Sequence, residues 1–138
     1  MKVIQILLVV CLALTLVFVG CQGKTAQYST ATPEGTIKLL LGAHENLDVN
    51  KATELFVKED REKIHSHLSQ LWGQQESVAY SEIEIKVMSQ TENTAKVKVE
   101  GEVIIAEKDM PSQRMGIGDE FNLVKQGSEW LIKAPPDL

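Results

Sequence analysis

Residues 95–105, AKVKVEGEVII, alternate apolar and charged side chains over most of their length. A period of two is typical of a β-strand that has one covered and one solvated face. The alternation recurs at three further places, so the predicted strands cover residues 82–88, 95–105, 120–123 and 129–133. Gly101 falls on the apolar face in mid-strand, which favours a bulge or bend there. The sequence therefore predicts a curved, four-stranded antiparallel sheet.

The segment before these strands has a helical period. Thr32, Pro33 and Glu34 supply an N-cap, a proline at the first helical position and an acid in the first turn. Asp48 can cap a second, short helix, and a third begins near residues 59–60 and ends at Gly73. The expected apolar stripes are Ile37, Leu40, Leu41 and His44; Val49, Ala52, Leu55 and Phe56; and Ile64, Leu68, Leu71 and Trp72. The pattern predicts an α+β domain in which three N-terminal helices pack on one face of the sheet.

The last two strands form a predicted hairpin. Gln126 and Gly127 are read as a two-residue turn, which would pair Leu123 with Trp130 and Phe121 with Ile132. We expect these four side chains to face the helices, with Trp130 as a main contributor to the core.

The first 21 residues carry a targeting signal. Lys2 precedes an apolar run from Ile6 to Val19 that is broken only by Thr15, and Gly20 and Cys21 follow. The run is shorter than the roughly 20 residues of a spanning helix and suits a signal peptide. We therefore expect a signal peptide at 1–20, a polar tether at 21–31 and a domain at 32–138. An ordinary secreted protein in which Cys21 is incidental, or an uncleaved anchor, are the alternatives.

Cleavage before Cys21 changes the composition. It leaves 13 Lys and Arg against 19 Asp and Glu, a net charge of −6, and it removes Cys11. The acidic balance argues against a nucleic-acid partner. With Cys21 lipidated, no thiol remains for a disulfide, a cysteine metal site or a cysteine nucleophile.

Two resemblances follow from these residues. The end of the apolar run at Gly20-Cys21 resembles the lipobox of bacterial lipoproteins, which implies lipidation at Cys21; Phe18 departs from the usual aliphatic residue. The chain also resembles small bacterial lipoproteins of the nuclear transport factor 2-like superfamily, which includes ketosteroid isomerase and polyketide cyclases. The second resemblance rests on 32–34, 47–49 and 121–132, and it implies a cone-like fold without implying a chemistry.

Site chemistry is sparse in the sequence. The predicted inward residues of the strands are all apolar or glycine, with no inward Asp, Glu or His, so we expect no catalytic, cofactor-binding or metal-binding residues. Only His44 and Tyr80 could reach the cone as acid or base. We expect His44 to be a core or rim residue with its hydrogen bonds met, and Tyr80 to pack as an aromatic ring. His65 and His67 lie two apart on a helix and point in opposite directions, so they cannot share a metal.

Two functions are compatible with the sequence. The favoured one is a lipid-anchored module outside the cytoplasm that binds a small apolar ligand or another envelope protein, on the outer membrane by default if the host has two membranes. The alternative is a cone-pocket enzyme, isomerase-like or cyclase-like, with His44 as its base. A cavity of roughly 300 Å³ or more between the first helix and the sheet would support a small-molecule site.

Overall fold

The computed structural model describes residues 27–138. The predicted signal peptide, Cys21 and most of the tether lie outside the described residues. Within the described part, no helix is both long and apolar enough to cross a membrane.

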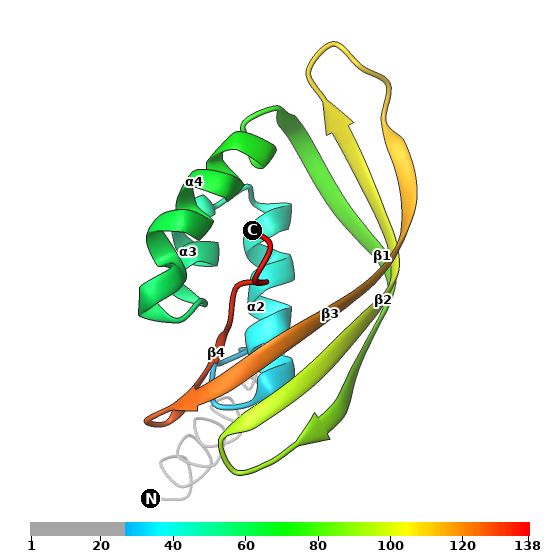
Figure 1. Cartoon of the computed structure of the whole chain (residues 1–138). Coiled ribbons are helices and arrows are strands. Elements are labelled where there is room, and N and C mark those ends of the chain that lie inside the picture. The colour runs from blue at the N-terminus through cyan, green and yellow to red at the C-terminus, as the bar shows by residue number, and fades with distance from the viewer. Residues whose placement is uncertain (1–26) are drawn as a thin grey trace, which may run out of the picture.

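The described chain is an α+β domain with its helices first and its sheet second, as predicted. The helices are α2 (Pro33–Glu45), α3 (Val49–Glu54) and α4 (Arg61–Trp72), with a 3₁₀ turn at Lys58–Asp60 before α4. The strands are β1 (Gln75–Gln90), β2 (Thr94–Glu107), β3 (Gln113–Gln126) and β4 (Glu129–Ile132). They pair antiparallel in the order β1-β2-β3-β4. The long strands curve around α2, and α3 and α4 form a further layer beyond it (Figure 1).

The predicted helix caps are present. The Thr32 side chain accepts a hydrogen bond from the backbone N–H of Gly35, and Asp48 does the same for Lys51 at the start of α3. Thr30 joins the segment before α2 to the sheet, because its carbonyl oxygen accepts the Trp130 N–H at 2.7 Å. The domain's packing thus includes residues that precede α2.

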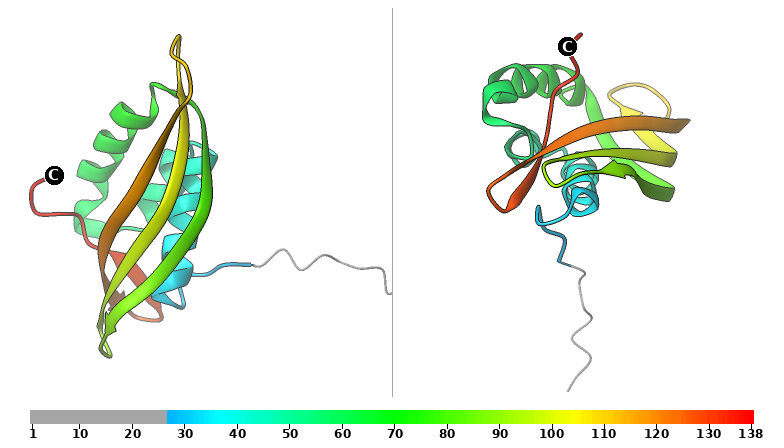
Figure 2. Two further views of the ribbon diagram at one scale, coloured as in Figure 1. Left: turned by 90° about the vertical axis from the view of Figure 1, so that its right-hand side faces the viewer. Right: turned by 60° about the horizontal axis from the view of Figure 1, so that its bottom comes forward.

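One core lies between the helices and the concave face of the sheet, and Figure 2 shows the sheet covering the helices from one side. Its buried members come from every helix and from β2, β3 and β4: Ile37, Leu40, Ala43, Ala52, Leu55, Phe56, Ile64, Trp72, Ala95, Val97, Val99, Leu123, Trp130 and Ile132. Leu71, which the sequence places on the apolar stripe of α4, is instead 50% exposed at the helix end. Leu55 and Phe56 follow α3, and Phe56 forms a parallel bridge with Ile132.

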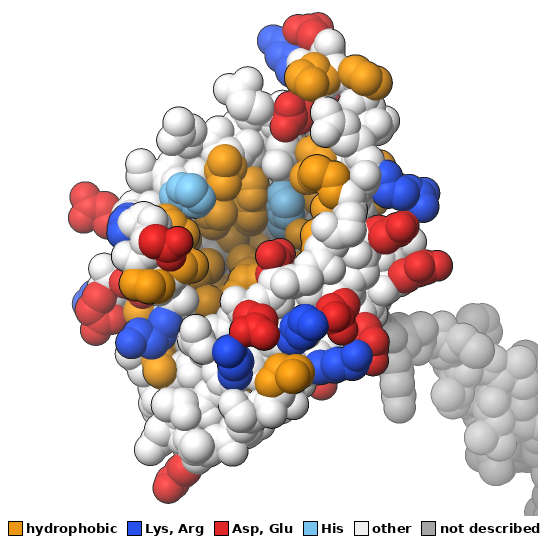
Figure 3. Space-filling model, turned by 45° about the vertical axis from the view of Figure 1, so that its right-hand side comes forward, with side chains coloured by type: hydrophobic (Ala, Val, Ile, Leu, Met, Phe, Trp, Pro, Cys, Tyr) orange, Lys and Arg blue, Asp and Glu red, His pale blue; other side chains and the backbone are white. Residues whose placement is uncertain are grey.

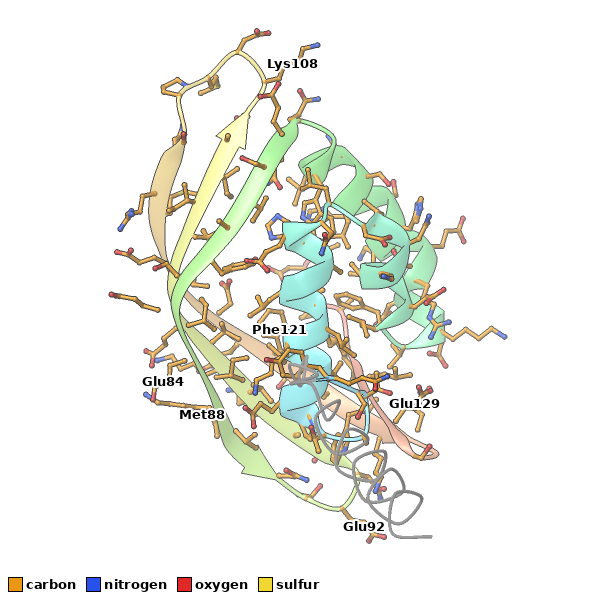
Figure 4. All side chains as sticks on the ribbon, turned by 180° about the vertical axis from the view of Figure 1, so that it is seen from behind. Glu84, Met88, Glu92, Lys108, Phe121 and Glu129 are labelled. Carbon is orange, nitrogen blue, oxygen red and sulfur yellow. The ribbon has the colours of Figure 1, made fainter. Side chains whose placement is uncertain are left out.

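The convex face of the sheet carries a set of ion pairs. Lys86, Lys96 and Lys98 form ion pairs there with acids on the same or the neighbouring strand. Figure 4 shows Glu84 pointing outward from this face, whereas Phe121 lies on the side of the helices. Exposed ion pairs of this kind contribute little to stability. We therefore attribute the charged residues of this face to its exposure to solvent.

Gly101 marks a bulge, as predicted, although the extra residue is on the neighbouring strand. Ser81 pairs with Glu102 and Glu84 pairs with Glu100, so two residues of β1 oppose Gly101. Glu82 has a φ of 54° and Gly101 a φ of 147°. The extra residue reverses the alternation of β1, and Tyr80 and Ile83 therefore both face inward.

Two strands are longer than predicted. β1 begins at Gln75 rather than near residue 82, because the bulge interrupts the alternation that marks a strand. β3 begins at Gln113 rather than residue 120. Its first half alternates Met115, Ile117 and Asp119 with two glycines, so Arg114 is the one charged residue on its outer face.

The predicted register of the last hairpin is wrong by one residue on each strand. Gln126 pairs with Glu129 and Leu123 with Ile132, so the turn is Gly127-Ser128. Gly127 has a φ of 63°, and Ser128 is outside the positive-φ region. Glycine first in a two-residue turn is the requirement of type II′. The displacement keeps the inward face unchanged, so Trp130 and Ile132 are buried at 3% and 1% exposure as expected.

Candidate functional site

A cavity of about 590 Å³ lies between α2, α4, β3 and the segment after β4. Most of its lining is apolar, including Leu40, Phe56, Ile64, Trp72 and Val99. Figure 3 shows this hollow as a hydrophobic surface with histidine and acidic side chains beside it. The volume lies within the range of small-molecule sites.

Two of the lining residues, His44 and Tyr80, belong to a hydrogen-bonded cluster built around His44. This residue lies in the last turn of α2, and its ring stacks on Trp72 of α4 with a centroid distance of 4.4 Å. Its Nε2 donates to Gln75 Oε1 at 2.8 Å, and its Nδ1 accepts from the Tyr80 hydroxyl at 2.6 Å. The side-chain oxygen of Gln75 can only accept a hydrogen bond, so it fixes the tautomer in which His44 carries its proton on Nε2. His44 thus has both ring nitrogens hydrogen-bonded, as expected.

Burial sets the protonation of the cluster. It lowers the pKa of His44 below its ordinary value, although the Gln75 hydrogen bond and Glu45 act in the opposite direction. Burial also raises the pKa of Tyr80 well above its ordinary value, and the negative charges of Asp119 and Glu45 add to this shift. At neutral pH the cluster therefore contains a neutral imidazole and a neutral phenol.

Tyr80 has a polar role beyond the predicted aromatic packing. It lies in the middle of β1, with its side chain toward α2, and its backbone N–H donates to Glu45 Oε1 at 3.2 Å. The bulge lies between Tyr80 and Ile83. Simple alternation back from the inward Ile83 would therefore place Tyr80 on the outer face. Its inward orientation depends on the extra residue of β1.

Asp119 contradicts the prediction that no strand offers an inward acid. It pairs with Val99, which is buried in the core, and it lines the same cavity as His44 and Tyr80. The sequence does indicate this inward orientation, because Asp119, Phe121 and Leu123 follow one another at intervals of two residues. The predicted strand begins at residue 120 and so stops one residue short of this acid.

The segment after β4 covers part of the cavity. Pro135, Pro136 and Leu138 are among its lining residues. Two hydrogen bonds hold the start of this segment: the Lys133 N–H donates to the backbone oxygen of Asn122, and the Ala134 N–H donates to the Asp60 side-chain Oδ2, both at 2.9 Å. The 3₁₀ turn before α4 is thereby connected to the cavity rim.

The remaining histidines do not join the cluster. His65 and His67 are exposed on α4, and only His67 borders the cavity. Among residues 27–138 there is no group of three His, Cys, Asp or Glu residues placed to hold a metal ion.

No family model and no curated protein matches this sequence. Solved structures do match in fold. A proposed aromatic ring hydroxylase from Novosphingobium aromaticivorans has a TM-score of 0.64 at 10% identity, over 71% of this chain and 80% of its own. A proposed scytalone dehydratase from the same species has a TM-score of 0.58 at 17% identity, over 71% and 75%.

A third match names the fold family. It is a proposed dehydratase of the NTF2-like family from Streptomyces avermitilis, with a TM-score of 0.58 at 12% identity, over 70% of this chain and 86% of its own. Identities this low establish the fold without the activity. The helices, the curved sheet and these similarities together show that the chain has the NTF2-like cone fold.

Proposed function

We propose that this protein is a lipid-anchored module outside the cytoplasm that binds a small, largely apolar ligand in the cone. The observation that carries the proposal is the cavity of about 590 Å³, which combines apolar walls with a few polar groups. The neighbours described as dehydratases or as a hydroxylase support a cone that holds small molecules.

A cone-pocket enzyme with His44 as its base is the second candidate. The neutral imidazole and the inward Asp119 favour it, since both are groups that proton transfer uses. The hydrogen bonds of His44 oppose it. The lone pair on Nδ1 accepts the Tyr80 proton, and Nε2 is bonded to Gln75, so neither nitrogen is free for a substrate. Binding without chemistry is therefore the better-supported function.

Anchoring would come from lipidated Cys21, and the geometry suits a tethered cone. The first described residues pack beside β4 at the N-terminal end of α2, whereas His44 is at its other end. At 1.5 Å per residue, Pro33 and His44 are about 16 Å apart along the helix. The cluster of His44, Tyr80 and Gln75 would thus lie at the end away from the tether.

The anchoring proposal is tested by Cys21→Ser. We expect this variant to lose the lipid, measured by metabolic labelling with a fatty acid, and to leave an unprocessed or mislocalised precursor. A variant that is still cleaved and still partitions with membranes would contradict the lipoprotein assignment.

Ligand binding is tested with a neutral naphthyl dye whose emission rises in apolar surroundings. Ile117 lines the cavity, and Ile117→Trp should fill it and weaken dye binding by about tenfold or more. Ile104 is on the outer face of the neighbouring strand, so Ile104→Trp is the matched control and should bind normally. Failure of the unmodified protein to bind the dye, or equal binding by both variants, would contradict a site in this cavity.

A further inference from the structure

We propose that the ligand of the cone is an apolar molecule that ends in a protonated amine. The inference rests on the proposed function, since it names the chemical class of the bound molecule. It follows from the hydrogen-bonding capacity of the groups at the polar end of the cavity, and from the charge of Asp119.

The cluster of His44, Tyr80 and Gln75 has no proton left for a ligand at the phenol or the imidazole. Tyr80 gives its hydroxyl proton to His44 Nδ1, and His44 gives its Nε2 proton to Gln75 Oε1. The Tyr80 oxygen keeps a free lone pair and can only accept a further bond. A ligand group that meets this oxygen must therefore be a donor.

Asp119 is a second acceptor on the same cavity. It lies on the inward face of β3, and the ion pairs of the described residues leave it without a cationic partner. Its neighbour Glu120 differs, since it pairs with Lys96 at 2.8 Å. Lys133 also borders the cavity, and it too forms no ion pair with Asp119. The carboxylate is thus available to a ligand.

These two acceptors discriminate among polar groups. A carboxylate or phosphate would bring a like charge toward Asp119 and oxygen lone pairs toward Tyr80, which is unfavourable. A hydroxyl can donate one uncharged hydrogen bond. An ammonium group has three donors and a charge that compensates that of Asp119, so it suits these acceptors better than a hydroxyl does while its hydrocarbon body contacts the apolar walls.

The experiment compares three compounds of one chain length: decylamine, decanol and decanoate, below their micelle concentrations. Each displaces the neutral naphthyl dye from the protein at neutral pH and low salt. Decylamine should compete about tenfold better than decanol, the lower end expected for a charge-assisted hydrogen bond at an exposed carboxylate. Decanoate should be the weakest of the three.

Two variants test whether Asp119 causes the preference for decylamine. Asp119→Asn should bring decylamine to the affinity of decanol and leave decanol itself unchanged. Glu92→Gln makes the same change of charge at the exposed turn between β1 and β2, and it should keep the tenfold preference.

The outcomes separate the two proposals. Equal affinity for amine and alcohol, a preference for decanoate, or an unchanged preference in Asp119→Asn overturns the amine inference while the binding function stands. Absence of both dye binding and decanol binding overturns the binding function itself.

Discussion

Substitution of Gly101 by alanine tests the bulge that places Tyr80 at the cavity. Gly101 has a φ of 147°, which is unfavourable for any residue with a side chain. A Cβ at this position would lie 2.7 Å from Ile83 Cδ1 and 2.8 Å from the carbonyl oxygen of Glu82. The isoleucine can move, but the carbonyl is part of the bulge and cannot move without changing it.

The expected loss has two parts. A non-glycine residue in a sparsely populated backbone region costs about 1–3 kcal/mol. Relief of the contact with Glu82 adds about 1 kcal/mol, as overpacking does in a well-packed interior. Gly101→Ala should therefore lower the free energy of unfolding by about 2–4 kcal/mol.

Urea unfolding, followed by tryptophan fluorescence, measures this loss. Two glycine controls separate its causes. Gly127 has a φ of 63° but open space where a methyl group would lie, so Gly127→Ala should show the backbone cost alone, about 1–2 kcal/mol. Gly118 has open space and no positive φ, so Gly118→Ala should change stability by less than about 0.5 kcal/mol.

The variant also has a structural consequence. If the bulge relaxes, the alternation of β1 changes and Tyr80 loses its hydrogen bond to His44. The dye should then bind more weakly to Gly101→Ala than to Gly118→Ala. A Gly101→Ala protein as stable as Gly118→Ala, with normal dye binding, would refute the assignment of the bulge to Gly101.

Three further predictions concern the core, the cluster and the cavity rim. Trp130→Ala should destabilise by about 3–5 kcal/mol in thermal or urea unfolding, because the ring is 3% exposed in the core, and a loss below about 1 kcal/mol would contradict this packing. Burial lowers the pKa of His44, so the unfolded state takes up this proton first, and stability should fall as the pH drops below about 6.5. His44→Gln should flatten that part of the profile of unfolding free energy against pH, and an unchanged slope would show that His44 titrates normally. Asp60→Ala removes the acceptor of the Ala134 N–H and should speed hydrogen exchange at the backbone amides of Ala134, Asp137 and Leu138, with a stability loss of about 1 kcal/mol; unchanged exchange there would show that the bond does not hold this segment.

Local sequence patterns predict the three helices, the four strands and the packing of the helices on one face of the sheet, although β1 and β3 extend further than their patterns show. Thr32 and Asp48 cap their helices through short-range hydrogen bonds that depend only on nearby residues. The alternation in residues 95–105 identifies the central strand and its buried face, because a strand with one covered side must repeat every two residues. These features predict an α+β domain with its helices on one face of a curved sheet, and the cone-like fold is what the resemblance to the nuclear transport factor 2-like superfamily implies.

The candidate site depended on tertiary structure. His44 and Tyr80 are 36 positions apart and meet because α2 packs on β1, while the inward orientation of Tyr80 depends on one extra residue in the strand. Asp119 could have been placed inward by extending the alternation of β3, but its position on the same cavity as that pair depends on how the sheet curves. The hairpin register depends on which two residues form the turn. Gly127 has a positive φ and must come first in a type II′ turn, so the turn is Gly127-Ser128 and not Gln126-Gly127. Sequence periodicity therefore determines which face of a strand is buried, whereas the bulges, turns and curvature of the folded sheet determine which buried side chains meet.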